Sequence, residues 1–414
     1  MTPPTEWRRM TLADVCSLRA GAAFKPALQG RISGDYPFIK VRDFNSSQNL
    51  IKINGADNWV SEADIPSIYG KPFPAGTSVF AKIGEALKHN RVRLLTRPTY
   101  IDNNLMGALP KTDLIIPEYL FHTLRTFDFS SINAGTAVPY LTAGTLGRSE
   151  VFIPPIETQC RIASILSAYD ALIEVNLRRI AVLEEMARRL FDEWFCHFRF
   201  QGSEKALIAS TTDLPEGWHC VPFGSLATEV RDAVAPNEVD SSTPYVGLEH
   251  IPRRSTTLTD WGRADEITSL KLRFNRGDVL FGKIRPYFHK VAWAPFAGIS
   301  SSDAIIFRSR SSDYAALVLA VASSDQFVAH SVQTSNGTKM PRANSGILAK
   351  YPVPLPPDAL LRKFNNVVLG WVKMAATLNA INQHLVSSRD LLIPRLISGE
   401  LPIAVAESEL ETAA

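Results

Sequence analysis

The sequence predicts a multidomain α/β (α+β) protein in which two α/β domains are joined by a long antiparallel two-helix coiled coil with pseudo-two-fold symmetry. Three observations support this prediction: the chain repeats itself, each repeat reaches a Pro-Pro pair, and a heptad pattern of apolar residues follows each pair. The expected segments, in chain order, are a first domain (1–155), a helix (156–200), a linker (201–213), a second domain (214–357), a second helix (358–400) and a flexible tail (401–414).

The two halves carry the same landmarks in the same order. Gly76–Ile83 (GTSVFAKI) matches Gly277–Ile284 (GDVLFGKI), at an offset of about 201 residues, the spacing expected of a duplicated domain rather than of a short repeat. Further along, the halves share a Gly-Thr-x-x-Pro signature, at Gly135–Pro139 and Gly337–Pro341. A Pro-Pro pair follows each signature, at Pro154–Pro155 and Pro356–Pro357. Several matches in one register indicate a duplicated domain. Short β-like runs such as Thr77–Ile83 and Asp278–Ile284, separated by Gly and Pro, predict compact α/β domains with irregular loops.

Each Pro-Pro pair is followed by a predicted long helix. Apolar residues alternate at spacings of four and three, which is a heptad seam, and the seam contains Asn176 in the first helix and Asn382 in the second. Asn176 occupies a d-type position and Asn382 an a-type position. Because a faces d in an antiparallel pair, the two amides can satisfy each other, and this register places Ala187 opposite Trp371. The alternative is that these are ordinary core helices whose asparagines are unrelated.

The length of the paired helices has a functional implication. Residues 162–194 would span about 48 Å at 1.5 Å per residue. DNA half-sites one helical turn apart are separated by roughly 34–36 Å. Two unlike domains on such a ruler therefore suit two unlike half-sites separated by a fixed spacer.

Composition favours a soluble cytoplasmic protein. The net charge of +3 excludes a strongly basic nucleic-acid coat, although basic faces remain compatible with it. The four cysteines form no disulfide-like pattern, and the sequence contains neither an apolar signal core nor a membrane-length apolar run.

Motifs for intrinsic chemistry are missing. The sequence has no glycine-rich methyltransferase loop, no P-loop, and no acidic residue followed two positions later by Lys, as metal-dependent nucleases have. Cys196-His197 and His219-Cys220 form mirrored pairs, but adjacent ligands are an unusual zinc geometry. We therefore predict no catalytic residue and no metal site.

Two segments resemble the conserved regions of the specificity subunits of type I restriction-modification systems. Pro154–Ala163 (PPIETQCRIA) resembles their central conserved region, and Arg389–Leu401 (RDLLIPRLISGEL) resembles their distal one. The Gly-Thr signatures are similar to those near the end of each target-recognition domain. The second repeat departs from the pattern where Asp358-Ala-Leu-Leu replaces the Glu157-Thr-Gln159 element, which weakens its match and its expected contacts to a partner.

The resemblance implies a non-catalytic DNA-recognition subunit with two target-recognition domains, each reading one half of an asymmetric bipartite double-stranded DNA site. It also implies helices that dock two N6-adenine methyltransferase (modification) subunits and, beyond them, the restriction/translocase subunit. S-adenosylmethionine, Mg²⁺ and ATP are then expected only on those partners, with no cofactor bound by this chain. The alternative is a stand-alone DNA-binding regulator or antirestriction protein with the same architecture.

Candidate DNA contacts are residues able to donate to phosphates or reach base edges from matching places in the two repeats. In the first domain they are Arg42 and Asn45, in a loop after the predicted strand Phe38–Val41, and Lys82, Lys88, His89 and Arg91, in a polar run that also holds Asn90 and Arg93. In the second they are Arg253, Arg254, Lys283, Arg285, Tyr287, His289, Lys290, Lys339 and Arg342. The competing interpretations are a solvated charged face and, around the Gly-Thr signatures, simple turn chemistry.

Overall fold

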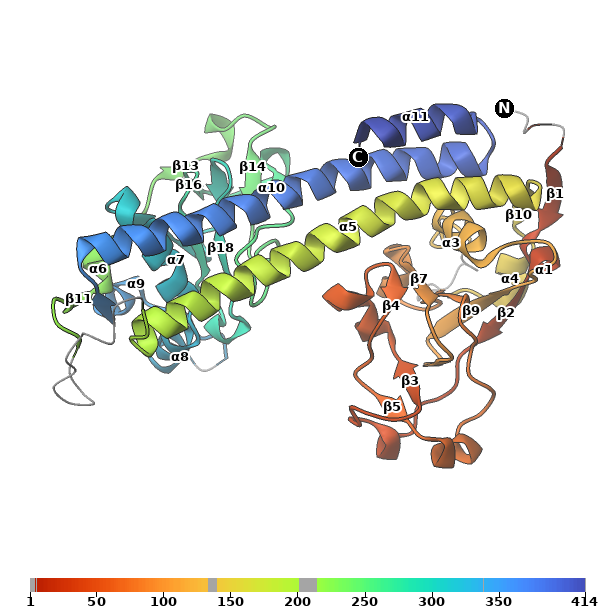
Figure 1. Ribbon diagram of the computed structural model, residues 1–414, viewed down its shortest axis with the longest axis horizontal. Helices are drawn as coiled ribbons and strands as arrows, with labels where there is room; N and C mark the ends of the chain where they lie inside the picture. The colour runs from red at the N-terminus through yellow and green to blue at the C-terminus, as the bar shows by residue number, and fades with distance from the viewer. Residues whose placement is uncertain (1–3, 5, 133–139, 201–213, 338, 414) are drawn as a thin grey trace. The chain divides into compact units, whose positions relative to one another are not determined.

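The computed structural model of the chain describes residues 4, 6–132, 140–200, 214–337 and 339–413 (Figure 1). Contacts divide it into unit 1, which is Met1–Glu174 with Gln383–Ala414, and unit 2, which is Val175–Asn382. The division passes through both long helices, α5 (Ile156–Phe191) and α10 (Asp358–Ile397). Each unit therefore holds one domain and a segment of each helix, whereas the sequence had suggested a division into domains and separate helices. The predicted linker 201–213 lies outside the described residues.

The domain of unit 1 is built on a mainly antiparallel five-stranded sheet. Its strand order is β2 (Cys16–Ala20), β9 (Leu105–Pro110), β6 (Ser78–Ala81), β7 (Val92–Leu95) and β4 (Lys52–Ile53). A three-stranded sheet has the order β5 (Trp59–Val60), β3 (Tyr36–Ile39) and β8 (Tyr100–Ile101), and β1 (Arg8–Thr11) pairs with β10 (Glu150–Ile153). The helices of this domain are α1 (Leu12–Val15), α2 (Glu85–Lys88), α3 (Pro117–Arg125) and α4 (Ala143–Gly147).

The domain of unit 2 has a four-stranded sheet in the order β12 (Ala227–Val230), β20 (Ala304–Ser309), β17 (Val279–Gly282) and β18 (Val291–Trp293). A five-stranded sheet has the order β13 (Ala233–Val234), β16 (Lys271–Phe274), β19 (Gly298–Ser300), β14 (Pro244–Val246) and β15 (Gly262–Arg263), and β11 (His219–Pro222) pairs with β21 (Pro352–Leu355). Its helices are α6 (Phe223–Leu226), α7 (Ala315–Ser323), α8 (Asp325–Gln333) and α9 (Ser345–Leu348).

The two domains share one topology. The order β2-β9-β6-β7 in unit 1 corresponds to β12-β20-β17-β18 in unit 2, and in both domains the first strand pairs with the last. Each domain has a parallel pair at a matching place, β3 with β8 and β14 with β19, and unit 1 has a further parallel pair, β4 with β7. The weak sequence repeat is thus a repeat of strand order.

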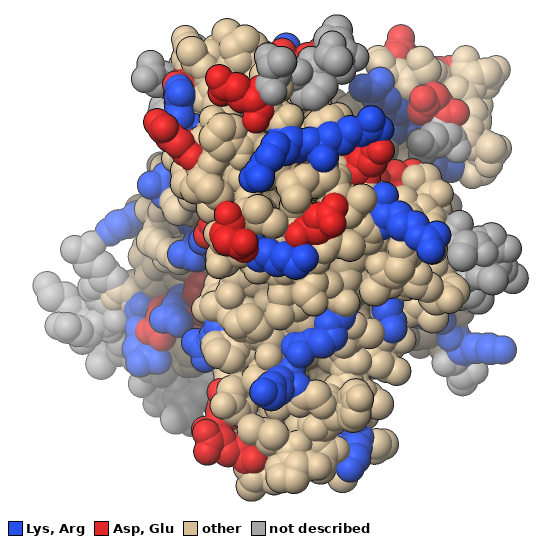
Figure 2. Space-filling view, turned by 90° about the vertical axis from the view of Figure 1, so that its right-hand side faces the viewer, with Lys and Arg blue, Asp and Glu red and all other residues tan. Residues whose placement is uncertain are grey.

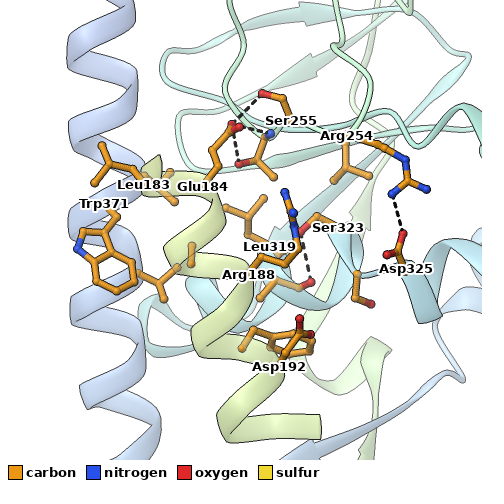
Figure 3. A pocket seen from close by; sticks show the side chains of 18 of the residues that line it. Leu183, Glu184, Arg188, Asp192, Arg254, Ser255, Leu319, Ser323, Asp325 and Trp371 are labelled. Carbon is orange, nitrogen blue, oxygen red and sulfur yellow. Dashed lines mark hydrogen bonds and ion pairs between the residues drawn. The ribbon is translucent and has the colours of Figure 1, made fainter. Parts of the chain in front are cut away.

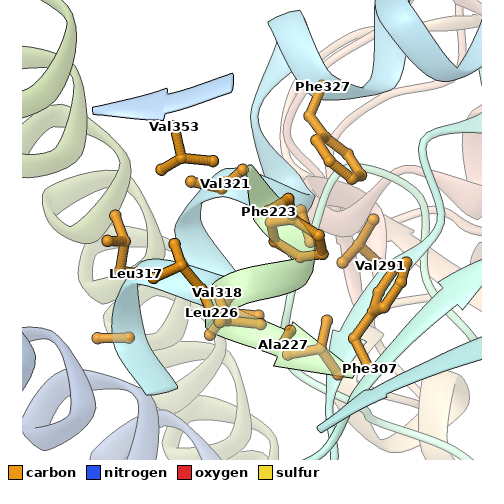
Figure 4. Packing of buried hydrophobic residues seen from close by; sticks show 14 of the residues in the cluster. Phe223, Leu226, Ala227, Val291, Phe307, Leu317, Val318, Val321, Phe327 and Val353 are labelled. Atoms are coloured by element: carbon orange, nitrogen blue, oxygen red, sulfur yellow. The ribbon is translucent and has the colours of Figure 1, made fainter. Parts of the chain in front are cut away.

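The core of unit 2 lies between its four-stranded sheet and helices α6 to α8. In Figure 4, Phe223 from α6 and Phe327 from α8 converge on the sheet residues Val291 and Phe307. Phe223 lies 5.1 Å from Phe307 and 5.0 Å from Phe327, measured between ring centroids. Short helices therefore cover one apolar face of the sheet, as burial of a sheet face requires, while Leu280, Ala292 and Ile306 of the same strands belong to a second buried cluster.

No single helix in the described part of the chain is long and apolar enough to cross a membrane. Taken together, Ser312–Ser323, which includes α7, and α8 reach that length and composition across a bend of 60°.

In unit 2, the segments of α5 and α10 pair in an antiparallel manner. Asn176 Nδ2 donates to Asn382 Oδ1 at 2.9 Å, and near the other end Trp194 lies 6.0 Å from Phe364 between ring centroids. Residue numbers therefore increase on one helix as they decrease on the other. The α-helix α5 ends at Phe191 and continues as a π-helical turn to Cys196, short of the predicted end at residue 200. Phe198, with a φ of 55°, has left the helical conformation.

In unit 1, α10 runs through Pro394 and ends at Ile397, before the predicted residue 400, and Gly399 adopts a φ of 76°. Glycine takes this left-handed conformation without strain, which suits a helix end. The prediction of a flexible tail at 401–414 is wrong, because α11 (Ile403–Ala413) forms beside α10 (Figure 1). Burial of Ala406 and an ion pair from Arg161 to Glu407 at 2.9 Å hold this helix in place.

Candidate DNA interface

One lysine has the same backbone environment in both domains. Lys82 follows β6 and Lys283 follows β17, and their amide groups donate to the carbonyl groups of Asn104 and Asp303 at 3.0 and 2.8 Å. The Lys82 carbonyl group accepts from the Leu141 amide at 2.8 Å, and the Lys283 carbonyl group accepts from the Ala343 amide at 2.9 Å. Leu141 and Ala343 each follow shortly after a Gly-Thr signature. The two lysines are therefore held at one position of the repeated fold.

Exposed apolar or aromatic residues occur close in sequence to each lysine or pair with the residue that follows it. Ile83 is bridged to Tyr140, and both side chains are exposed. In unit 2, Ile284 is bridged to Arg342, and Tyr287 and Met340 are exposed nearby in sequence. Such side chains can contact thymine methyl groups or stack on bases beside a phosphate-binding lysine. The sequence does not single out Ile83 and Met340, because isolated apolar residues resemble core residues until their exposure is known.

Several other candidates in unit 1 already have partners. Arg42 pairs with Asp57 at 3.1 Å, Lys88 pairs with Glu85 at 2.9 Å, and the Arg91 guanidinium donates to the Asn45 side chain. All but Arg91 are exposed, Arg91 is half-buried, and His89 is exposed at the end of α2. They can exchange these partners for phosphate oxygens, because exposed ion pairs contribute only about 0–1 kcal/mol.

Two members of the same polar run turn inward. Arg93 is buried in β7, where it donates to the carbonyl groups of Val92 and Phe44. Asn90 has a φ of 51° and its side chain bridges to the backbone of Phe127 and Phe129. These two side chains hold the loop together, so the run is not a uniform solvated face.

In unit 2, the loops carrying Arg253 and Arg285 enclose an aromatic ring. The Arg253 guanidinium lies 4.0 Å from the Phe288 ring centroid, and that of Arg285 lies 6.0 Å from it. Arg285 has a φ of 49°, and its amide donates to the Pro341 carbonyl group at 2.8 Å. The loop after β17 is thereby tied to the Gly-Thr-x-x-Pro signature.

His289 and Lys290 are held more tightly than the sequence suggested. The His289 side chain is 9% exposed, and its Nε2 lies 2.8 Å from the Ser323 carbonyl oxygen. Lys290 Nζ donates to the Leu248 carbonyl oxygen, and burial lowers its pKa, with a further contribution from Arg253. Both side chains support the loop in this structure, whereas Lys339 and Arg342 are exposed.

A pocket of about 320 Å³ lies within unit 2 between α5, α10 and the domain (Figure 3). Glu184 of α5 enters the loop of the domain, where its Oε1 accepts from Ser255 Oγ at 2.8 Å and from the Thr257 amide at 2.8 Å. On the far side of the pocket, Arg254 pairs with Asp325 at 3.1 Å. The helix is thus attached to the loop that carries two candidate DNA contacts.

Gln159, which follows the first Pro-Pro pair, stabilises the fold of its own unit. Gln159 is fully buried, its Nε2 donates to the carbonyl groups of Leu114 and Pro154 at 2.9 Å each, and its Oε1 accepts from the Ile116 amide at 3.0 Å. The second repeat has Leu361 there, buried in an apolar core. The expectation that this difference weakens contacts to a partner is therefore wrong for this side chain, since Gln159 has no surface to offer.

The structure describes the Gly-Thr signatures only in part, and the described residues contain no candidate metal cluster. The first signature, residues 135–139, and Thr338 of the second lie outside the described residues. Within the described ranges, no group of three or more His, Cys, Asp or Glu side chains could hold a metal ion.

Charge on the molecule is mixed. Figure 2 shows lysine and arginine side chains interspersed with acidic ones over the face that it displays. With a net charge of only +3, attraction of DNA depends on local groups rather than on a general positive field.

The sequence is similar to a known protein family and to known specificity subunits. Residues 4–185 match the family model described as the type I restriction modification DNA specificity domain. The chain is 24% identical to the type I restriction enzyme MjaIX specificity subunit of Methanocaldococcus jannaschii, covering 97% of this chain and 94% of that one. It is 22% identical to the EcoDI specificity subunit of Escherichia coli, covering 86% and 78%.

Among solved structures, the fold is similar to that of the type I restriction-modification S subunit from M. genitalium. The TM-score is 0.56, the sequence identity is 13%, and the alignment covers 96% of this chain and 99% of that one.

Proposed function

Because the chain belongs to the family of type I restriction-modification specificity subunits, we propose that each of its two domains reads one half of an asymmetric bipartite DNA site. The chain is the non-catalytic DNA-recognition subunit of such a complex. The observation that carries the two-reader proposal is the repeated environment of Lys82 and Lys283. The same arrangement of backbone hydrogen bonds holds one lysine in each domain, beside loops that differ in sequence.

In each domain, the lysine and the exposed loop residues have different roles in DNA recognition. The lysines donate to phosphates, which positions the domain without reading sequence. The exposed loop residues near them differ between the domains, with Tyr140 in one and Arg342 in the other. Different side chains at equivalent places select different bases, so the two half-sites differ.

The long helices set the spacing and carry the partners. At 1.5 Å per residue, Ile156–Phe191 corresponds to about 54 Å of helix, longer than the roughly 34–36 Å between half-sites one turn apart. The helices also dock two N6-adenine methyltransferase subunits and, beyond them, the restriction/translocase subunit. S-adenosylmethionine, Mg²⁺ and ATP belong to those subunits, and the complex works in the cytoplasm, where its DNA is.

Co-purification and methylation profiling test this proposal. The tagged chain should retain a methyltransferase subunit, and deletion of its gene should abolish adenine methylation at one bipartite motif in the host genome. Exchange of the domain at 214–357 for that of a relative should change one half of the motif and leave the other. A chain that purifies alone and leaves the methylome unchanged on deletion would instead be a stand-alone DNA-binding regulator.

A further inference from the structure

A second pocket, of about 460 Å³, lies within unit 1 and is lined by an unusual concentration of arginine. It is formed by the loop before β7, by α3 and by the last turns of α10. Its charged lining residues are His89, Arg91, Arg93, Arg125, Arg389 and Asp390. Leu50, Ile51, Phe121 and Ile393 add an apolar rim.

Carboxylates around this pocket compensate only part of its charge. Asp170 accepts from Arg389 at 2.7 Å and from Arg125 at 3.0 Å, and Asp390 lies 2.7 Å from Arg389. Four arginines therefore share two carboxylates, which leaves a charge of +2 without counting histidine. The carbonyl end of α3, at Arg125, contributes about half a negative charge, so the cluster stays positive.

Arg93 is the member whose hydrogen bonding is incomplete. Its side chain is buried, at 8% exposure, and its Nε has no hydrogen-bond partner among the described residues. Burial lowers its pKa to about 10, and the charges of Arg91, Arg125 and Arg389 contribute to this shift. A buried guanidinium beside like charges is costly unless an anion accompanies it.

We propose that this pocket binds a phosphate-type oxyanion between Arg91 and Arg93. Guanidinium groups match the geometry of phosphate oxygens, and the apolar rim lowers the local dielectric constant, which strengthens the attraction. The anion neutralises the excess positive charge beside the buried guanidinium. Two sources supply this chemistry: a phosphate of the bound DNA backbone, or free inorganic phosphate.

The first experiment uses inorganic phosphate on the full chain without DNA. Thermal unfolding is followed in phosphate and in chloride at equal ionic strength and pH. Phosphate should raise the Tm above the chloride value, and Arg91→Ala and Arg93→Lys should each reduce the phosphate affinity at least tenfold. Arg31→Ala is the matched control, because Arg31 is an exposed arginine of the same unit that pairs with Asp64 at 2.7 Å and does not line the pocket.

The second experiment measures DNA affinity of the assembled complex against salt. If a DNA phosphate occupies the pocket, Arg91→Ala should reduce the salt slope by about one unit. If free phosphate occupies it, the slope stays unchanged and only the phosphate-specific stabilisation is lost. Equal stabilisation by phosphate and chloride, together with an unchanged salt slope, overturns the proposal. The first experiment does not depend on the proposed function, so failure of one can be told from failure of the other.

Discussion

Asn176 and Asn382 meet in the seam between α5 and α10, and Asn176 Nδ2 donates to Asn382 Oδ1 at 2.9 Å. The two side chains are 7% and 5% exposed. A buried amide pair is satisfied in one register only, because sliding either helix by a turn places each amide against apolar neighbours. The pair therefore selects the alignment of the helices at some cost in stability.

Replacement of one asparagine should be more harmful than replacement of both. Asn176→Ala should lower the free energy of unfolding by about 1–3 kcal/mol, since Asn382 loses this partner in a buried place. The double change to leucine should recover most of that loss, because apolar seam residues pack without a polar partner. Urea denaturation measures both, with exposed Val182→Ala as the control. A double variant no more stable than the single one contradicts this account.

Asp170 and Glu185 provide a matched test of burial. Each carboxylate pairs with two arginines, but the side chain of Asp170 is 6% exposed and that of Glu185 is 40% exposed. Asp170→Asn should cost about 3–5 kcal/mol, because the buried guanidinium groups of Arg125 and Arg389 would then share only Asp390, whose side chain is 53% exposed. Glu185→Gln should cost about 0–1 kcal/mol. Equal losses in chemical denaturation would refute the assignment of Asp170 as the centre of this cluster.

The repeated lysines should contribute equally to DNA binding. Lys82→Ala and Lys283→Ala should each weaken binding of the assembled complex for every DNA sequence and reduce the salt slope by about one unit. Fluorescence anisotropy at several salt concentrations gives both values. Lys373→Ala serves as the control, since this exposed lysine belongs to α10 and not to the segments after β6 and β17. A loss of affinity for only one half-site, with unchanged slope, would mean that the lysine reads a base.

His122 should make unit 1 sensitive to acid. It is fully buried in α3, and burial lowers its pKa well below 6.5, with added repulsion from Arg125 and Arg389. The unfolded chain therefore binds a proton that the folded chain does not, so stability falls as the pH drops below about 6.5. The loss approaches about 1.4 kcal/mol per pH unit.

Denaturation between pH 7 and pH 5 checks this dependence. His122→Gln should lower stability at pH 7 but flatten its decline toward pH 5, whereas exposed His384→Gln should leave the slope unchanged. If the free energy of unfolding of His122→Gln falls as steeply toward pH 5 as that of the unchanged protein, other groups cause the loss of stability in acid.

The sequence by itself determined the duplicated landmarks, the heptad seam and the two asparagines, because helical periodicity and repeat spacing are local patterns that survive divergence. It also pointed to Lys82 and Lys283, since the same motif surrounds both. The sequence does not predict the helix at 403–413, because the small, acidic residues of the tail do not reveal that Ala406 is buried.

Only the tertiary structure decided which polar residues face solvent. Arg93 and His289 occur in runs that read as exposed surface, yet both are buried, and Gln159 turned out to bind backbone groups of its own unit. The meeting of Arg93, Arg125 and Arg389 could not be seen in the sequence, because their separations along the chain carry no information about distance. Burial and charge compensation are properties of the packed chain, and a local pattern does not encode them.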